Sequence, residues 1–343
     1  MSDEVRVLLA GAGRAGLVHG RHLAGRVPGG RLVAVADPSE QARDRAATEL
    51  GCERTFDDPV AGARDEGVDA VVIASPTFAH AAIAVAALET GKHVLCEKPI
   101  ATSLDDADRI VEAAHSSAGR FIMAFMRRFD RGFRRAAERI AAGDIGEPVL
   151  VRATGRGPGL PPEWAWDTTR SGGLVAEVNS HDLDTVRWLS GQEFSAVYAA
   201  GRAVKRPDLA HMFPGFVDVV VASFELDGGG LAQLDGACPA DYGYDTRVEV
   251  YGTEGTLLLG SPTTSGPVVV RREGASVDPV PSWRELFAAA YVAEDAHLVA
   301  VASGEEEPLT TVQDGVRALE AVLAINRSMH EQRRVMIDEL RSP

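Results

Sequence analysis

A histidine lies between two carboxylic acids in the segment 172–188, GGLVAEVNSHDLDTVRW. Glu177, His181 and Asp184 are spaced i, i+4 and i+7, which would place all three on one face of a helix. An unperturbed imidazole titrates at about pH 6.5, so it can take up or release a proton near neutral pH. The pattern predicts an acid–base unit made of His181 and the flanking carboxylates. The alternative is a polar helix face with an incidental histidine; Asp182 lies off this face and is expected to be structural.

A lysine at the end of an apolar strand is the second candidate for chemistry. Lys98 follows the apolar run 94–96 and Glu97, precedes Pro99, and is one of only three lysines in the chain. Because charged side chains are seldom buried without a partner, this placement predicts a specific role for Lys98. We expect it to lie where a cofactor bound by the first half of the chain meets a substrate bound by the second half.

A glycine-rich turn near the N-terminus predicts a dinucleotide site. The run 11–16, GAGRAG, follows the apolar stretch 5–10 and precedes a helical pattern, the context that this motif requires. Gly11 would allow the tight turn, Gly13 would let the backbone approach a pyrophosphate, and Gly16 would let the helix pack closely on the strand. The helix N-terminus would offer its unpaired N–H groups to the phosphates.

The second strand pattern, 31–37, ends in Asp37, 21 residues after Gly16. An acid at this strand end accepts hydrogen bonds from the 2′-hydroxyl of the adenosine ribose and repels a 2′-phosphate. Asp37 therefore favours NAD over NADP, although Arg14 and Arg43 keep NADP as the alternative. The other interpretation of Asp37-Pro38-Ser39 is a turn followed by a helix N-cap.

Apolar strands alternate with helical patterns through the first 125 residues. Further strands are expected at 69–75, 92–97 and 121–125, and helices at 80–89 and 104–116. This alternation predicts a Rossmann domain, a parallel sheet covered on both faces that binds its ligand at the carboxyl ends of the strands. The expected cofactor-binding residues are Gly11, Gly13, Arg14, Ala15, Gly16, Asp37, Ser75, Pro76, His80, Glu97 and Lys98. His80 is either a helix cap beneath the nicotinamide or a structural histidine.

The pattern changes in the second half of the chain. Alternating runs occur at 216–226, 231–238, 247–251, 255–259 and 268–271, separated by short glycine-rich turns. They leave no room for crossover helices, so a large, mostly antiparallel sheet is expected, with helices near 174–189 and 282–303. The predicted division is a Rossmann domain, residues 1–125, and an α+β domain for substrate binding and oligomerisation, residues 126–311. The amphipathic helix 312–330 is expected to pack back on the first domain.

Composition narrows the class of protein. A length of 343 residues suits two domains, and a net charge of −15 argues against nucleic-acid or membrane partners, which attract basic surfaces. Three cysteines without paired spacing favour a reducing compartment and no metal site. The N-terminus lacks the basic region of a signal peptide, and no apolar run approaches the roughly 20 residues of a membrane span. We expect a cytoplasmic protein.

Taken together, these motifs resemble the Gfo/Idh/MocA oxidoreductases over almost the whole chain, from Val5 to Met329. The resemblance is carried by GAGRAG, the strand-ending Asp37, ASPTFAH, GKHVLCEKP and the helix EVNSHDLDTVRW, and the EKP element, residues 97–99, is its most specific marker. Two further stretches, FMRRFD at 125–130 and YGYDTRVEV at 242–250, are similar to the inositol 2-dehydrogenase branch.

The resemblance implies roles for individual residues. Lys98 would contact the nicotinamide ribose and the reacting hydroxyl, and His181 would be the general base. Glu177 stands where inositol dehydrogenases have an aspartate, which puts myo-inositol itself in question. The expected substrate-binding residues are Lys98, Arg127, Asn179, His181, Asp184, Tyr242 and Tyr244.

The expected function is NAD-dependent oxidation of a secondary ring hydroxyl of a cyclitol or sugar to a ketone. The expected substrate is small and polyhydroxylated, and by class the enzyme is a homodimer or homotetramer. Arg127 and Arg170 could instead hold a phosphate or carboxylate, so one alternative is an NADP(H)-dependent sugar or nucleotide-sugar ketoreductase. The other is a non-catalytic dinucleotide-binding regulator, which would need the glycine turn and Asp37 but neither Lys98 nor His181.

Overall fold

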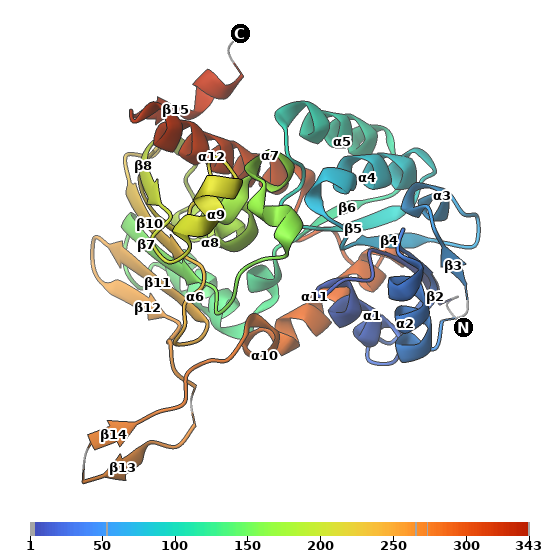
Figure 1. Cartoon of the computed structure of the whole chain (residues 1–343), viewed down its shortest axis with the longest axis horizontal. Coiled ribbons are helices and arrows are strands. Elements are labelled where there is room, and N and C mark those ends of the chain that lie inside the picture. Colours follow the sequence, from blue (N-terminus) through green and yellow to red (C-terminus); the bar gives the residue numbers. More distant parts are fainter. Residues whose placement is uncertain (1–3, 53, 265, 273, 342–343) are drawn as a thin grey trace. The chain divides into compact units, whose positions relative to one another are not determined.

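The computed structural model describes residues 4–52, 54–264, 266–272 and 274–341. The chain forms two compact units, each built from two stretches of sequence. The first unit comprises Met1–Asp130 and Ala289–Leu319, and the second comprises Arg131–Ala288 and Glu320–Pro343. Each unit contains a large sheet (Figure 1).

The first unit is built on a six-stranded sheet in which all paired strands are parallel. In sheet order the strands are β3 (Thr55–Phe56), β2 (Gly30–Ala36), β1 (Val5–Ala10), β4 (Ala70–Ile73), β5 (His93–Glu97) and β6 (Phe121–Ala124). Every residue of β4 and β6 is buried, as expected for strands covered on both faces. The predicted Rossmann domain is confirmed.

Helices cover both faces of this sheet. Figure 1 shows α1 (Gly16–Leu23) and α2 (Glu40–Leu50) together on one face, and α4 (His80–Glu89) and α5 (Leu104–Ser116) together on the other. The short helix α3 (Pro59–Ala63) contacts α4. The strand order reverses between β1 and β4, so the carboxyl ends of these two strands mark the point at which sheets of this kind bind ligands.

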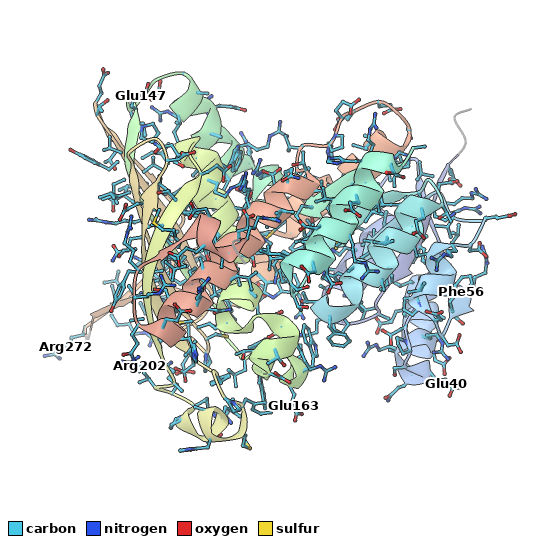
Figure 2. The ribbon with its side chains drawn as sticks, turned by 90° about the horizontal axis from the view of Figure 1, so that it is seen from above. Glu40, Phe56, Glu147, Glu163, Arg202 and Arg272 are labelled. Carbon is cyan, nitrogen blue, oxygen red and sulfur yellow. The ribbon has the colours of Figure 1, made fainter. Side chains whose placement is uncertain are left out.

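The second unit is built on a seven-stranded sheet in which only the β10–β7 pair is parallel among the described residues. In sheet order the strands are β12 (Thr256–Leu259), β11 (Asp245–Gly252), β7 (Pro148–Arg156), β10 (Leu231–Ala237), β9 (Val219–Leu226), β8 (Phe194–Arg202) and β15 (Val335–Met336). Glu147 and Arg202 lie toward opposite ends of this sheet (Figure 2). The predicted α+β unit with a mostly antiparallel sheet is confirmed.

Helix α8 (Ser180–Ser190) lies against β7 and β10 on one face of this sheet. Two glycines make the close approach possible. A Cβ atom on Gly155 would lie 1.9 Å from Oδ2 of Asp182, and one on Gly236 would lie 2.1 Å from Oδ1 of Asn179. Both glycines are in strands, so their missing side chains set how near the helix comes to the sheet.

The other helices of the second unit are short or lie near its segment boundaries. They are α6 (Arg131–Ala141), α7 (Thr168–Ser171), α9 (Pro207–Met212), α10 (Trp283–Leu286) and the later part of α12 (Val312–Glu331). The helix predicted over 282–303 is two helices, α10 and α11 (Ala288–Ala302). From Ala289 onward α11 belongs to the first unit, whereas the predicted division placed it in the second.

Helix α12 also differs from the prediction, because its residues up to Leu319 group with the first unit and those from Glu320 with the second. Hydrophobic periodicity identifies a helix and its buried face, but it carries no information about which body that face contacts. That is the physical reason for both differences in domain assignment.

A hairpin of β13 (Val269–Arg271) and β14 (Gly274–Ser276) extends away from the seven-stranded sheet, with Arg272 at its tip (Figure 2). Its described strand residues are all exposed. None of the helices in the described part of the chain is long and apolar enough to cross a membrane.

Candidate active site

The glycine turn after β1 has the geometry that its sequence predicts. Gly11 adopts φ +102°, a conformation that favours glycine, and its N–H donates to the carbonyl oxygen of Ala36 at 2.8 Å. A Cβ atom on Gly16 would lie 1.9 Å from the carbonyl oxygen of Gly11, so this position also requires glycine. A Cβ on Gly13 would meet no described atom within 4 Å, which leaves room for a phosphate to approach the backbone there.

Asp37, one residue after β2, is fixed beside this turn. Its Oδ2 accepts the N–H of Ala12 at 2.9 Å, and its Oδ1 accepts the N–H of Ser39 at 2.9 Å. Ser39 caps α2 by accepting the N–H of Ala42, so the segment 37–39 also forms the turn and N-cap of the other interpretation. Arg43 donates to the carbonyl oxygen of Asp37 at 2.7 Å. The turn and the acceptor at the end of β2 therefore fit a dinucleotide with a free ribose 2′-hydroxyl.

His80 opens α4 and is almost fully buried. Its Nδ1 lies 2.8 Å from the carbonyl oxygen of Pro99, and its Nε2 lies 2.9 Å from that of Ser75. Burial holds the pKa of His80 below its ordinary value, and a neutral ring can donate to only one of the two carbonyls. His80 thus connects the end of β4 to the turn after β5, which favours the structural interpretation.

Glu97 is the last residue of β5, and Lys98 follows it with a cis peptide bond to Pro99. The buried carboxylate of Glu97 accepts the backbone N–H of Lys98 at Oε2, 3.1 Å away. Its Oε1 lies 3.3 Å from Nε2 of His19. Burial favours the neutral acid, but His19 and Lys98 outweigh it and hold the pKa of Glu97 below its ordinary value.

The predicted acid–base group of the second unit spans a change of helix type. Glu177 lies in a π-helix, Val175–Asn179, and His181 and Asp184 lie in the α-helix that continues from it. Because the helix type changes between Glu177 and His181, their i, i+4 spacing does not place the two side chains as it would in a regular α-helix. Single π-turns occur frequently at functional sites.

Side-chain contacts further distinguish the residues of this helix. Asn179 is fully buried and donates to the carbonyl oxygen of Gly155 at 3.2 Å and to Asp182 at 2.9 Å. Its amide is therefore turned toward the sheet, which favours a structural role. Asp184 is buried, with Oδ1 3.7 Å from a guanidinium nitrogen of Arg187.

The two tyrosines predicted to line the pocket lie in different surroundings. Tyr244 is buried, with its ring edge-to-face against Phe287 at 6.4 Å. Tyr242 is 46% exposed and donates to Asp245 at 2.6 Å. Asp245 is the register partner of Arg156 in the sheet. Because successive residues of a strand point to opposite faces, both side chains lie on the face opposite Gly155 and therefore opposite α8. Within the second unit, the hydroxyl of Tyr242 is not brought together with His181. Arg127 belongs to the first unit, in the buried turn Met126–Phe129.

Comparison with known proteins now identifies the family. Residues 5–125 match the model of the oxidoreductase family with an NAD-binding Rossmann fold, and residues 133–258 match the Gfo/Idh/MocA C-terminal domain. The scyllo-inositol 2-dehydrogenase (NAD(+)) of Bacillus subtilis is 33% identical over 100% of this chain and 99% of its own length. The chain belongs to the Gfo/Idh/MocA family.

Two further proteins are similar to this chain over nearly their whole length. The myo-inositol 2-dehydrogenase of Thermotoga maritima is 30% identical over 98% of this chain and 99% of its own. The crystal structure of scyllo-inositol dehydrogenase from Lactobacillus casei, with bound NAD(H) and scyllo-inositol, has a TM-score of 0.91 at 28% identity. It covers 98% of this chain and 99% of that one. The resemblance found in the sequence is confirmed.

Sequence reasoning missed a cluster of buried polar residues that this Gfo/Idh/MocA protein carries next to Glu97. His19 and His22 come from α1, and Glu294 and Asp295 come from α11. The signal was present, because two adjacent acids interrupt the apolar helix AAAYVAEDAHLVAVA. The separation of 276 positions between His19 and Asp295 hid their contact. Among the described residues, no group of three or more His, Cys, Asp or Glu is arranged to hold a metal ion.

Proposed function

We propose that this protein oxidises a secondary ring hydroxyl of a cyclitol to a ketone with NAD⁺. The observation that carries the proposal is the glycine turn with Asp37 fixed beside it, in the same sheet as the EKP stretch that ends β5. The proposal is supported by relatives that match the chain from end to end and are named inositol 2-dehydrogenases. Gly13, Asp37 and the N-terminus of α1 would hold the dinucleotide.

Three side chains carry the proposed chemistry. When bound, NAD⁺ accepts the hydride from the ring carbon. His181 takes the hydroxyl proton, and Glu177 orients the imidazole. The ammonium group of Lys98 donates a hydrogen bond to the substrate oxygen and stabilises the negative charge that develops as the proton leaves. Positioned acid–base groups of this kind accelerate such steps by about 10²–10⁴-fold.

The proposed substrate-binding set is narrower than the sequence suggested. We retain Lys98, Arg127, His181, Asp184 and Tyr244. Asn179 and Tyr242 are left out, because the amide of Asn179 bonds to the sheet and the hydroxyl of Tyr242 lies on the far face from α8. Glu177, one methylene longer than aspartate, would shift the imidazole or reach the substrate, so we expect a hydroxyl pattern different from that of myo-inositol to be preferred.

We further propose a cytoplasmic homo-oligomer, a dimer or tetramer. Five large side chains of the described strands are exposed on the face of the seven-stranded sheet opposite α8: Tyr198, Val221, Leu231, Tyr251 and Leu258. An apolar surface of this kind is usually covered by a second copy. In the described part of the chain the three cysteines form no disulfide, which suits a reducing compartment.

A substrate panel tests the proposed function. Wild-type protein is incubated with scyllo-inositol, myo-inositol, other inositols and plain pyranoses, with NAD⁺ or NADP⁺, and the absorbance of the reduced cofactor is followed. We expect turnover of at least one cyclitol with NAD⁺ and much less with NADP⁺. Turnover only with NADP⁺ would favour the sugar ketoreductase instead. Failure of every substrate with both cofactors would contradict the proposal and favour a binding role.

A further inference from the structure

The buried polar cluster of the first unit is a continuous chain of contacts. His19, fully buried, places Nδ1 2.6 Å from Oδ1 of Asp295 and Nε2 3.3 Å from Oε1 of Glu97. The other oxygen of Asp295 lies 2.8 Å from Nδ1 of His22. The other oxygen of Glu97 accepts the backbone N–H of Lys98. The chain thus runs from α11, through a residue of the helix that follows the glycine turn, to the peptide group of Lys98.

His19 has carboxylate groups at both ends of its ring. Burial alone would lower its pKa, but Asp295 and Glu97 outweigh burial and raise the pKa well above the ordinary value. Only the doubly protonated ring can donate to both acids at once. A third buried acid, Glu294, lies close enough to feel the charges of His19, Glu97 and Asp295, and burial raises its pKa well above the usual range. The contacts of His19 with an acid at each ring nitrogen therefore favour its protonated form, and burial favours the protonated form of Glu294.

From this geometry we infer that His19 is a positioning residue for Lys98. Its bond to Glu97 fixes the carboxylate, and the carboxylate fixes the N–H of the Glu97–Lys98 peptide, so that Lys98 leaves β5 in one direction. Asp295 holds the imidazole ring from the opposite side. The inference rests on the proposed function in one respect only, the assignment of Lys98 as a catalytic residue.

A second buried histidine serves as a control that distinguishes a positioning role from a general contribution to packing. His297 lies on the same helix as Asp295, is similarly buried, and places Nδ1 2.6 Å from Glu306 while its Nε2 accepts the N–H of Leu309. None of the described contacts of His297 reaches Glu97 or Lys98. Replacing His297 thus removes another histidine–carboxylate pair from the first unit, one whose acid is exposed, without touching the peptide of Lys98.

Two substitutions of His19 each preserve a different one of its two contacts. The amide nitrogen of asparagine is the same number of bonds from Cα as Nδ1, and that of glutamine as Nε2. His19→Asn can therefore keep the bond to Asp295 and loses the one to Glu97, whereas His19→Gln can keep the bond to Glu97. A structural role predicts that both variants are harmful in proportion to their loss of stability. A positioning role predicts that His19→Asn displaces the backbone of Lys98 more than His19→Gln does.

The scarcity of lysine supplies a direct readout. Because the chain contains only Lys92, Lys98 and Lys205, ¹⁵N-lysine labelling yields three backbone amide signals. In the protein without substrate, we expect the Lys98 signal to shift and to exchange its proton faster with solvent in His19→Asn. The change should be smaller in His19→Gln and absent in His297→Gln. The signals of Lys92 and Lys205 serve as internal controls.

Kinetics provides the second readout. We expect kcat to fall on the order of ten- to hundredfold in His19→Asn, with the affinity for NADH little changed, because a misplaced catalytic group slows chemistry more than binding. Should His19→Asn fail to fold, Asp295→Asn is measured instead; it removes the charge that holds the ring, and the Lys98 signal should respond in the same direction.

The outcomes separate the two proposals. An unchanged Lys98 signal in a folded His19→Asn variant, or an equal change in His297→Gln, would overturn the positioning role. If the wild type oxidises no cyclitol or sugar, the proposed function fails, yet the response of the Lys98 amide to His19→Asn still decides the positioning role.

Discussion

The glycine turn of the first unit and the helix that carries His181 in the second are held in place by different kinds of contact. In the turn, backbone atoms pack against each other, since Gly16 lies against the carbonyl oxygen of Gly11. Under α8, side chains meet backbone, since Asn179 and Asp182 fill the space above Gly155. The first geometry follows from a short motif, whereas the second depends on a helix and a strand that are far apart in sequence. Substitutions in the two places should therefore affect different steps.

The largest expected effect comes from the proposed catalytic residues, one in each unit. We expect Lys98→Met and His181→Asn each to lower kcat by about 10²–10⁴-fold, because each removes a group that assists proton transfer or stabilises the developing charge. Initial rates with a cyclitol and NAD⁺ measure the loss, and NADH fluorescence measures binding. If His181→Asn weakened NADH binding as much as it slowed turnover, the assignment of cofactor binding to the first unit and of proton transfer to the second would be wrong.

Two glycines of the turn should respond differently to the same methyl group. Gly16→Ala forces an atom against the carbonyl oxygen of Gly11, and overpacking of this kind costs about 1–3 kcal/mol of unfolding free energy or more. Gly13→Ala points its methyl group into open space, so the midpoint of thermal unfolding should stay near that of the wild type while NADH binding weakens. Equal loss of stability in both variants would contradict the open approach to the backbone at Gly13.

Beneath α8, Gly155→Ala should impair turnover without affecting the cofactor. Its Cβ would lie 1.9 Å from Asp182, so the helix or the strand must move, at a cost of about 1–3 kcal/mol. We expect kcat to fall because His181 moves with α8, while NADH affinity is retained. Gly159→Ala is the matched control, since a Cβ there would meet no described atom within 4 Å. A Gly155→Ala variant with unaltered kcat would show that the position of α8 is not critical.

The smallest effect concerns pH and stability in the first unit. Burial raises the folded-state pKa of Glu294 well above its unfolded value, and His19, Glu97 and Asp295 face it. Its contribution to stability is therefore fully present below the unfolded pKa of about 4.5 and is lost as the pH rises through the folded pKa. Glu294→Gln should flatten the decline of the unfolding midpoint as the pH rises above the unfolded pKa. A decline as steep as that of the wild type would mean that Glu294 does not contribute to this pH dependence.

The same contrast explains what the sequence could predict. Gly11, Asp37 and Glu97 follow directly from strand ends and a local motif, so their places at one edge of the parallel sheet were predictable. The turn of Asn179 into the sheet was not, because it depends on the absence of a side chain at Gly155. The π-helix at Glu177 was not predictable either, since helical periodicity does not distinguish a widened turn from a regular one.

The cluster around His19 lay beyond prediction for a third reason. Its members come from α1, β5 and α11, and helical periodicity does not reveal that α11 returns to the first sheet. Two acids within an apolar helix are a usable signal, because buried acids need partners. The partner could be identified only from the fold.

Transfer of a labelled hydride tests the central claim most directly. Wild-type protein is incubated with NAD⁺ and scyllo-inositol deuterated at its ring carbons, and the mass of the reduced cofactor is measured, with Lys98→Met and His181→Asn as controls. The account predicts reduced cofactor that carries one deuterium from the substrate, formed rapidly by the wild type and far more slowly by both variants. Reduced cofactor without deuterium, or equal rates in all three proteins, would contradict it.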